Sequence, residues 1–197
     1  MRNKNNKQSG YTIIETMIAI SIFLVVVTVG MGALLNANSL HKKSQDMRSI
    51  IDNLSFIMED MSRSLRTGYS YQCFRKNIDT TLSPATLGVP RNCNDGWAIA
   101  FEHASGEVTT YSDQSVYYIN SGKIFRSNAG ATSDSFVQLT PDEVVLDSVS
   151  GFFVVGAEAG DIQQPFVTIK LVGSITSKGI TSPFSLQTSV SQRALDI

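Results

Sequence analysis

The sequence has few of the residues that enzymes and metal sites require. Its 197 residues include two cysteines, Cys73 and Cys93, and two histidines, His41 and His103. No Cys-x-x-Cys pair is present, so a zinc site has little support. The sequence also lacks Gly-x-Ser-x-Gly, His-Glu-x-x-His and a P-loop. We therefore expect a protein that is not an enzyme and binds no cofactor.

Charge is scarce as well. Charged residues make up 17% of the chain, and the net charge is -1. General binding to nucleic acid depends on clustered Lys and Arg, and disorder depends on low hydrophobicity with high net charge. Neither class fits this composition. Acids that could build a calcium site lack EF-hand spacing, so we expect solvated carboxylates there. These acids are Asp134, Asp142, Glu143, Asp147, Glu158 and Asp161.

The two cysteines have two interpretations. If this region is exported, they form one disulfide that closes a loop of about 20 residues, worth roughly 3 kcal/mol through loop-closure entropy. The alternative is a pair of buried free thiols.

What the sequence does contain is an apolar run from Tyr11 to Leu35 that includes one charged residue, Glu15. A run of this length spans a bilayer as an α-helix. Basic residues before the run favour a cytoplasmic N-terminus, although two more follow it. They are Arg2, Lys4 and Lys7 on one side and Lys42 and Lys43 on the other.

The run is too long for a secretory signal peptide, and no clear Ala-x-Ala site ends it. We expect it to stay in the mature protein as an anchor. Glu15 then needs an explanation, because an ionised acid is costly within a membrane helix. Glu15 either lies at the headgroup boundary, where its carboxylate stays hydrated, or pairs with a cation when helices associate.

The segment "SGYTIIETMIAISIF" has Gly10, an aromatic residue at Tyr11, apolar residues at 13 and 14, and Glu15. This pattern resembles the class III signal of type IV pilins and of the pseudopilins of type II secretion. The family usually has Phe where Tyr11 stands.

The resemblance implies a function for each of these residues. A membrane prepilin peptidase would cut after Gly10 and N-methylate the new first residue, Tyr11. Glu15 would neutralise the N-terminal amine of a neighbouring subunit in a filament, a pairing that low dielectric makes strong. The resemblance thus favours the second interpretation of Glu15.

Beyond Leu35 the apolar residues continue at spacings of three and four, which is typical of an amphipathic helix. We expect one helix from about 12 to 66, with Gly68 as its stop. The alternative is two helices hinged near residues 30–38. The expected stripe is Met47, Ile51, Leu54, Met58, Met61 and Leu65, widened by Ile50 and Ile57.

Residues 68–96 show little periodicity and predict an irregular loop pinned by the cysteines. Arg75, Lys76 and Arg91 cluster in it, either as a solvated surface or as a patch that touches a partner or DNA.

From Trp97 the period becomes two, which predicts strands. We place Trp97, Ile99 and Phe101 on one face, followed by a hairpin that turns at Ser105 and Gly106. A second hairpin turns at residues 120–122. Longer strands are expected within 144–158, within 164–175 with Val167, Ile169 and Leu171 on one face, and within 182–193 with Phe184, Leu186 and Val190 alternating.

The predicted fold is α+β: a long N-terminal helix packed on a C-terminal antiparallel sheet of five to seven strands, which is also what the resemblance implies. The expected divisions are a leader at 1–10, a transmembrane helix at 11–35, an amphipathic helix at 36–67 and a sheet domain at 68–197.

The resemblance implies a structural subunit of a type IV pilus or a type II secretion pseudopilus. Chain length and "SFIMEDMSRSLR" resemble minor subunits, loosely the J-type pseudopilins. Its partners would be other subunits, prepilin peptidase and the inner-membrane assembly platform. It would sit in the cytoplasmic membrane with its C-terminal domain outside. The alternatives are a DNA-uptake pilin and an anchored binding domain that never polymerises.

Overall fold

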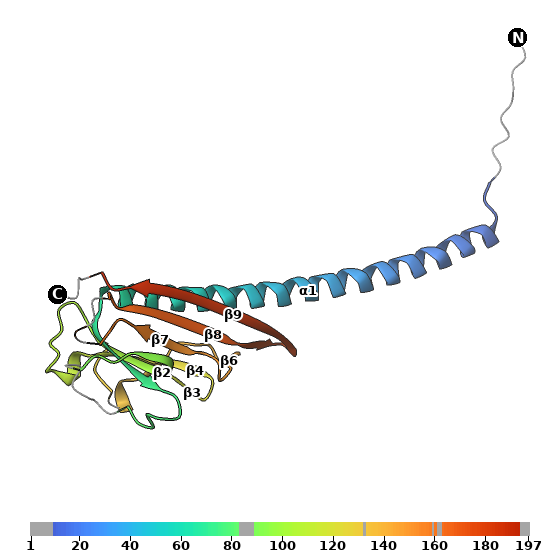
Figure 1. Cartoon of the computed structure of the whole chain (residues 1–197). Coiled ribbons are helices and arrows are strands. Elements are labelled where there is room, and N and C mark those ends of the chain that lie inside the picture. The colour runs from blue at the N-terminus through green and yellow to red at the C-terminus, as the bar shows by residue number, and fades with distance from the viewer. Residues whose placement is uncertain (1–9, 83–88, 132, 159, 161–162, 194–197) are drawn as a thin grey trace, which may run out of the picture. The chain divides into compact units, whose positions relative to one another are not determined.

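The computed structural model describes residues 10–82, 89–131, 133–158, 160 and 163–193. The chain divides into two compact units, residues 1–45 and 46–197. We call residues 46–197 the head. One helix, α1 (Ile13–Thr67), passes from the first unit into the second (Figure 1).

The remaining elements all belong to the head. They are β1 (Tyr69–Arg75), β2 (Cys93–Glu102), the 3-10 helix η1 (Tyr111–Asp113), β3 (Ser115–Asn120), β4 (Lys123–Ser127), the 3-10 helix η2 (Ser133–Ser135), β5 (Val137–Gln138), β6 (Val144–Leu146), β7 (Gly151–Val155), β8 (Phe166–Ser177) and β9 (Ile180–Ser191).

A single α1 confirms the expected long helix, and the alternative of two hinged helices is wrong. The helix continues through Gly30 and Gly32, because no proline interrupts it and isolated glycines cost only about 1 kcal/mol each. It ends at Thr67, where the Gly68 N–H still donates to the Ser64 carbonyl at 3.1 Å.

Within the head, α1 buries one face against the sheet. The expected stripe is confirmed with one correction, because Ile51 is exposed while Ile50 is buried. Positions 50, 54, 57 and 61 follow the i, i+4, i+7 spacing of one helical face, and Ile51 lies about 100° around the helix from Ile50. The buried residues are Ile50, Leu54, Ile57, Met58, Met61 and Leu65, and Met47 is partly buried.

The β-strands form one antiparallel sheet. Nine strands are described, more than the five to seven expected, because short strands such as β5 and β6 add to the longer ones. The order is β5-β4-β3-β2-β7-β8-β6, with β1 also paired to β2 and β9 to β8. The two longest strands, β8 and β9, pair along their whole lengths.

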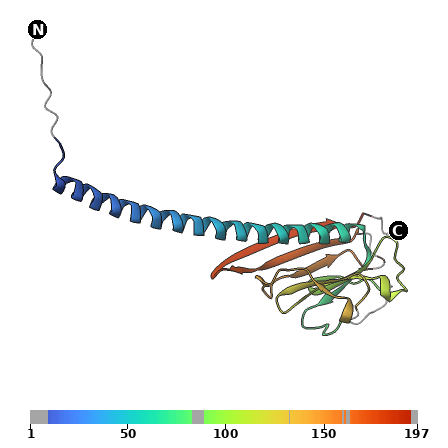
Figure 2. The ribbon, with the colours of Figure 1, turned by 180° about the vertical axis from the view of Figure 1, so that it is seen from behind.

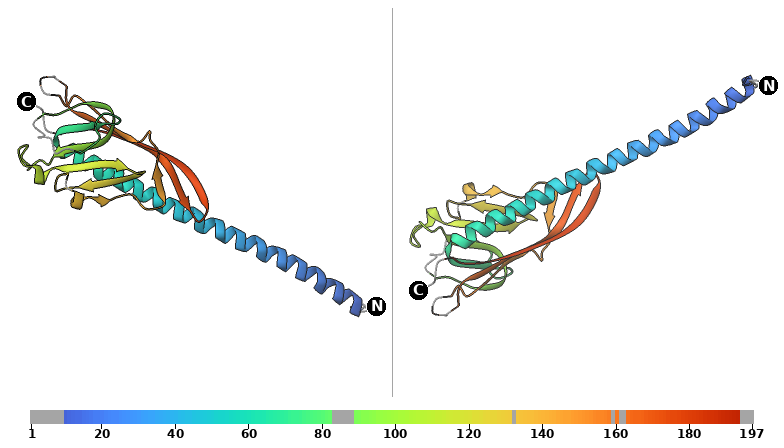
Figure 3. Two further views of the ribbon diagram at one scale, coloured as in Figure 1. Left: turned by 90° about the horizontal axis from the view of Figure 1, so that it is seen from below. Right: turned by 90° about the horizontal axis from the view of Figure 1, so that it is seen from above.

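The head portion of α1 lies along one face of this sheet, with β9 on one side of it and β4 on the other (Figure 3). On the β4 side, Arg126 binds Asp60 of α1 with 2.7 Å between Nη1 and Oδ2. On the β9 side, Met58 and Ser62 of α1 line a groove together with Leu186. The head portion of α1 therefore contacts strands on both of its sides and contributes to the middle of the head's core.

The sheet is covered on both faces at β2. Ile99 and Phe101 belong to the main core with α1. Ala98 and Ala100 belong to a second, smaller cluster on the other face. Trp97 packs with this second cluster, against the rings of Phe74 and Tyr118. The expectation that Trp97 shares a face with Ile99 and Phe101 is therefore wrong. The pairing of β2 with β1 is irregular at this point, because Phe74 lies opposite Ala98 and Arg75 lies opposite Gly96, which leaves Trp97 as the extra residue of a bulge.

Residues 69–75 form β1, so the expectation of an irregular loop from 68 onward is wrong. This strand carries no clear alternation because both its faces are buried over residues 71–74. It pairs with β2, bringing Cys73 opposite Ile99. The part of the loop at 83–88 lies outside the described residues.

The first hairpin is also longer than expected. β2 pairs with β3, but residues 107–110 are not a strand, and the connection runs from His103 to Gln114 through η1. The second hairpin is confirmed, with Ser121 and Gly122 at positive φ of 49° and 75°. Two such residues define the turn that best matches the twist of paired strands.

The C-terminal strands follow their predicted alternation. Val167, Ile169 and Leu171 of β8 are buried, and Val190 of β9 is buried with Phe184 and Leu186 partly so. Residues 144–155 form two strands, β6 and β7, rather than one. Ser150, in the turn between them, exchanges hydrogen bonds with Val172 of β8, which fixes this break.

Candidate processing and assembly segment

The residues expected to be processed lie just before α1. Gly10 and Tyr11 are exposed and precede the first helical residue, Ile13. Tyr11 is 82% exposed. Glu15 lies in the first turn of α1, where its N–H donates to the Thr12 carbonyl at 3.1 Å. A carboxylate in this turn interacts favourably with the helix dipole. The segment is thus open to an enzyme, and the acid sits at the helix start.

The apolar side chains that follow Glu15 are largely exposed within their own unit. Most large residues from Ile13 to Leu35 are more than half exposed, and Val27 is of intermediate exposure. None of the most apolar stretch of this helix is buried, and by length and composition the helix is a candidate membrane span. An apolar surface of this size demands a cover of lipid or of other helices.

Polar side chains within the span are satisfied internally. Ser21 Oγ donates to the Met17 carbonyl at 2.8 Å, and Thr28 Oγ1 donates to the Leu24 carbonyl at 2.7 Å. Such bonds remove the need for water around these hydroxyls in a bilayer. Glu15 is exposed, and within a bilayer its carboxylate needs water or a partner of opposite charge.

Comparison with known families identifies this segment. Residues 5–31 match the family model described as the prokaryotic N-terminal methylation motif. This motif is the signal of type IV pilin-like prepilins, and the matched range contains Gly10, Tyr11 and Glu15. The match covers the start of the chain and not the head. Neither a curated protein nor a solved structure matches the chain.

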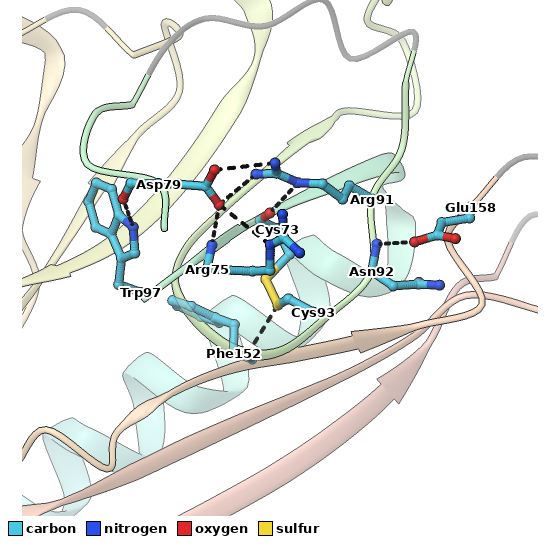
Figure 4. Close-up of polar contacts among 9 residues, drawn as sticks. All are labelled: Cys73, Arg75, Asp79, Arg91, Asn92, Cys93, Trp97, Phe152 and Glu158. Atoms are coloured by element: carbon cyan, nitrogen blue, oxygen red, sulfur yellow. Dashed lines mark hydrogen bonds and ion pairs between the residues drawn. A yellow bond between two sulfur atoms is a disulfide. The ribbon is translucent and has the colours of Figure 1, made fainter. Parts of the chain in front are cut away.

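In the head, Cys73 of β1 and Cys93 of β2 are joined in a disulfide (Figure 4). Both cysteines are buried. The Cys93 sulfur lies 3.5 Å from the Phe152 carbonyl oxygen of β7. The bond therefore links β1 to the central strand β2, and it has a structural role.

The basic cluster expected as a possible DNA surface is neutralised. Arg91 Nη2 binds Asp79 Oδ2 at 2.9 Å, and Arg75 approaches the same carboxylate at 3.9 Å (Figure 4). Lys76 Nζ donates to Asp95 Oδ1 at 2.6 Å and to the carbonyls of Ser148 and Ser150 at 2.7 Å each. These contacts leave little positive charge to attract a polyanion.

Among the described residues, no group of three or more His, Cys, Asp or Glu side chains is arranged to hold a metal ion. Asp142 and Glu158, two of the loop acids considered for calcium, instead take part in bonds with Gln138 and with the Asn92 backbone. Asp161 lies outside the described residues.

One notable residue was missed from the sequence. Glu102, the last residue of β2, is fully buried, and burial together with the neighbouring Asp113 raises its pKa to about 7. From the sequence alone, a glutamate at the end of an alternating strand is expected to face solvent. The signal that could have found it is the run "AIAF" before it, since alanines on the second face indicate a strand covered on both sides.

Proposed function

We propose that this chain is a type IV pilin-like structural subunit, made as a precursor and cut after Gly10. Tyr11 becomes the mature N-terminus and is N-methylated. The subunit then assembles through the first part of α1 into a type IV pilus or a type II secretion pseudopilus. The observation that carries the proposal is a methylation motif at the start of an exposed apolar segment, residues 11–35, whose one charged side chain is Glu15.

Cleavage after Gly10 changes the local charge. It removes Arg2, Lys4 and Lys7 and creates a single amine at Tyr11. When helices gather out of water, an unpaired carboxylate is costly and an opposite charge nearby is strongly attractive. We propose that Glu15 pairs with the Tyr11 amine of a neighbouring subunit and so fixes the axial register between the two helices.

The remaining parts have separate roles in this proposal. Residues 1–10 are the leader, residues 11–35 the membrane and filament segment, residues 36–67 the helix that continues into the head, and residues 68–197 the sheet domain outside the cytoplasmic membrane. The partners are other subunits, prepilin peptidase and the inner-membrane platform. We favour a minor subunit, and the work is mechanical and without turnover.

Intact mass spectrometry of the membrane-extracted protein, co-expressed with a prepilin peptidase, tests the processing step. The expected species lacks residues 1–10 and carries one additional methyl group. A full-length species under these conditions would support the rival, an anchored binding domain that never polymerises.

The assembly step needs its own test because processing alone does not prove polymerisation. Glu15→Gln keeps the size of the side chain and removes its charge, so we expect normal cleavage with a loss of about tenfold or more in recovered filaments or in subunit crosslinking. Glu59→Gln, an exposed acid of α1 paired with Arg63, is the matched control and should assemble normally. Equal assembly of the two variants would overturn the role of Glu15.

A DNA-uptake pilin is the other rival. It predicts salt-sensitive DNA binding that is lost when Arg75, Lys76 and Arg91 are neutralised. The acids and carbonyls that bind these three side chains argue against it.

A further inference from the structure

Glu102 lies at the end of β2, opposite Tyr69 of β1, with none of its surface exposed. Neither of its carboxyl oxygens makes a hydrogen bond of normal geometry among the described residues, although the neighbouring Gln114 amide, whose Nε2 is also buried and unpaired, acts on it as a donor. A buried carboxylate without partners costs several kcal/mol, so the neutral acid is the form that such a site accepts. This residue has no part in the proposed filament helix and needs its own explanation.

The connection from His103 to Gln114 covers this carboxyl. Gly106 packs directly on it, since a Cβ at Gly106 would lie 2.6 Å from Glu102 Oε2. Asp113 of η1 also approaches, with its Oδ1 buried and without a partner among the described residues. The loop thus brings a carboxyl group of its own, Asp113, close to the buried carboxyl of Glu102. Like charges in one site disfavour a second ionisation.

No opposite charge compensates the pair. Asp113 is the charged group that acts on Glu102, and no lysine or arginine of the described residues offsets it. From β1 the facing group is the Tyr69 phenol, whose own pKa is raised by burial and then by Glu102, Asp113 and Glu107. The amide of Gln114 favours the ionised form of Glu102 only weakly against burial and Asp113.

His103 does not supply the missing charge either. Its Nε2 lies 2.7 Å from Ser115 Oγ, and its ring packs edge-on against Phe101. Phe101 and Ser115 are paired residues of β2 and β3, and successive strand residues point to opposite faces, so Glu102 lies on the other face from Phe101.

A few polar contacts hold the loop closed. Tyr69 Oη donates to the Gly106 carbonyl at 2.6 Å, and the Glu107 N–H donates to Asp113 Oδ2 at 3.1 Å. Within the loop, the Gly106 N–H donates to the His103 carbonyl at 2.8 Å. All of these contacts surround the buried carboxyl, so a charge on it would act on each of them.

We propose that Glu102 is a proton-operated latch: the protonated carboxyl allows the loop 103–114 to close over it, and ionisation beside Asp113 opens that loop. The step releases one proton to solvent and breaks no covalent bond. The loop lies at the end of the head where α1 ends, as the bond between Tyr69 and Gly106 requires (Figure 2). At this end of the head, the loop 103–114 is therefore closed at acidic pH and open near neutral pH.

Hydrogen exchange of the processed, full chain in detergent micelles tests the latch. Exchange would be followed by mass spectrometry at about pH 5, 6, 7 and 8, corrected for intrinsic rates, with EDTA present so that the proton is the only ligand. We expect the protection of loop peptides to fall as the pH rises towards neutrality, by up to about tenfold per pH unit, because opening releases one proton. Above neutrality the protection should no longer change with pH.

Three variants define the result. Glu102→Gln mimics the neutral acid and should keep the loop protected at every pH. Glu107→Gln removes an exposed acid of the same loop and should keep the wild-type pH dependence. Asp113→Asn should shift the dependence to lower pH, and it keeps the test decisive if Glu102→Gln does not fold. Protection that is independent of pH in the wild type, or equally pH-dependent in Glu102→Gln and wild type, would overturn the proposal.

Discussion

The two units of this protein differ in how their apolar and acidic side chains are covered. Residues 13–35 carry large apolar side chains that remain exposed within their own unit. The head buries its apolar residues itself and adds a disulfide and several internal ion pairs. Glu15 in the first unit is exposed, whereas Glu102 in the head is fully buried.

This difference shows where each unit obtains its stability. The first unit gains from burial only when a bilayer or neighbouring helices cover it, so changes there should appear in membrane insertion and assembly. The head completes its own core, so changes there should appear in its unfolding. Three measurements of unfolding test this contrast between buried and exposed side chains.

The largest expected difference lies between two leucines of the same helix. Leu54 is fully buried in the head and Leu24 is 57% exposed. Leu54→Ala should lower the free energy of unfolding of the head by about 2–5 kcal/mol, since it removes contacts and leaves a cavity. Leu24→Ala should leave it unchanged. Urea denaturation of the full chain in micelles, followed by Trp97 fluorescence, measures both, and a similar loss for the two variants would contradict the contrast.

A second measurement uses the buried acid. Burial and Asp113 raise the folded-state pKa of Glu102 from 4.5 to about 7. The folded head therefore binds a proton more tightly than the unfolded chain between these values, so its stability should fall as pH rises from about 4.5 to 7 and then level off, by at most about 3 kcal/mol. Urea midpoints across this range check it, and Glu102→Gln should remove this part of the pH dependence.

The smallest expected effect separates two lysines of the head. Lys76 Nζ has three oxygen partners and is mostly buried, so Lys76→Met should cost about 1–2 kcal/mol. Lys178 pairs with Asp46 at an exposed position, so Lys178→Met should cost less than about 1 kcal/mol. Thermal unfolding of the two variants side by side measures the difference, and a larger loss at Lys178 would count against it.

The sequence predicts well where periodicity is strong. The extent of α1 follows from its apolar spacing and from the absence of proline, and β8 and β9 follow from their alternation. The motif around Gly10 and Glu15 is local, so it can be read without knowing the fold. The assembly role of Glu15 stays a prediction because it depends on a second copy of the chain.

The sequence predicts poorly where partners decide the structure. Strand β1 shows no alternation because it is covered on both faces. Trp97 lies in a bulge of β2 against β1, which no local sequence pattern indicates. The burial of Glu102 could not be predicted either, because it also depends on residues that are distant in the sequence. Its burial depends on Asp113 and Gly106, which the loop brings back over the end of β2.

The position of Glu15 along α1 also sets a length. The helix from Thr16 to Leu35 rises about 30 Å, which equals the thickness of the hydrocarbon layer of a bilayer. Glu15 at one boundary and Asn36 at the other therefore bracket one membrane thickness. If the segment spans a bilayer as proposed, this length leaves no hydrophobic mismatch. Displacing the helix by one turn along the membrane normal would then move either Glu15 or Asn36 into the lipid, depending on the direction. Such an anchor would have a preferred depth, and the proposed transfer of the helix from the bilayer into a filament would begin with the free-energy cost of leaving that depth.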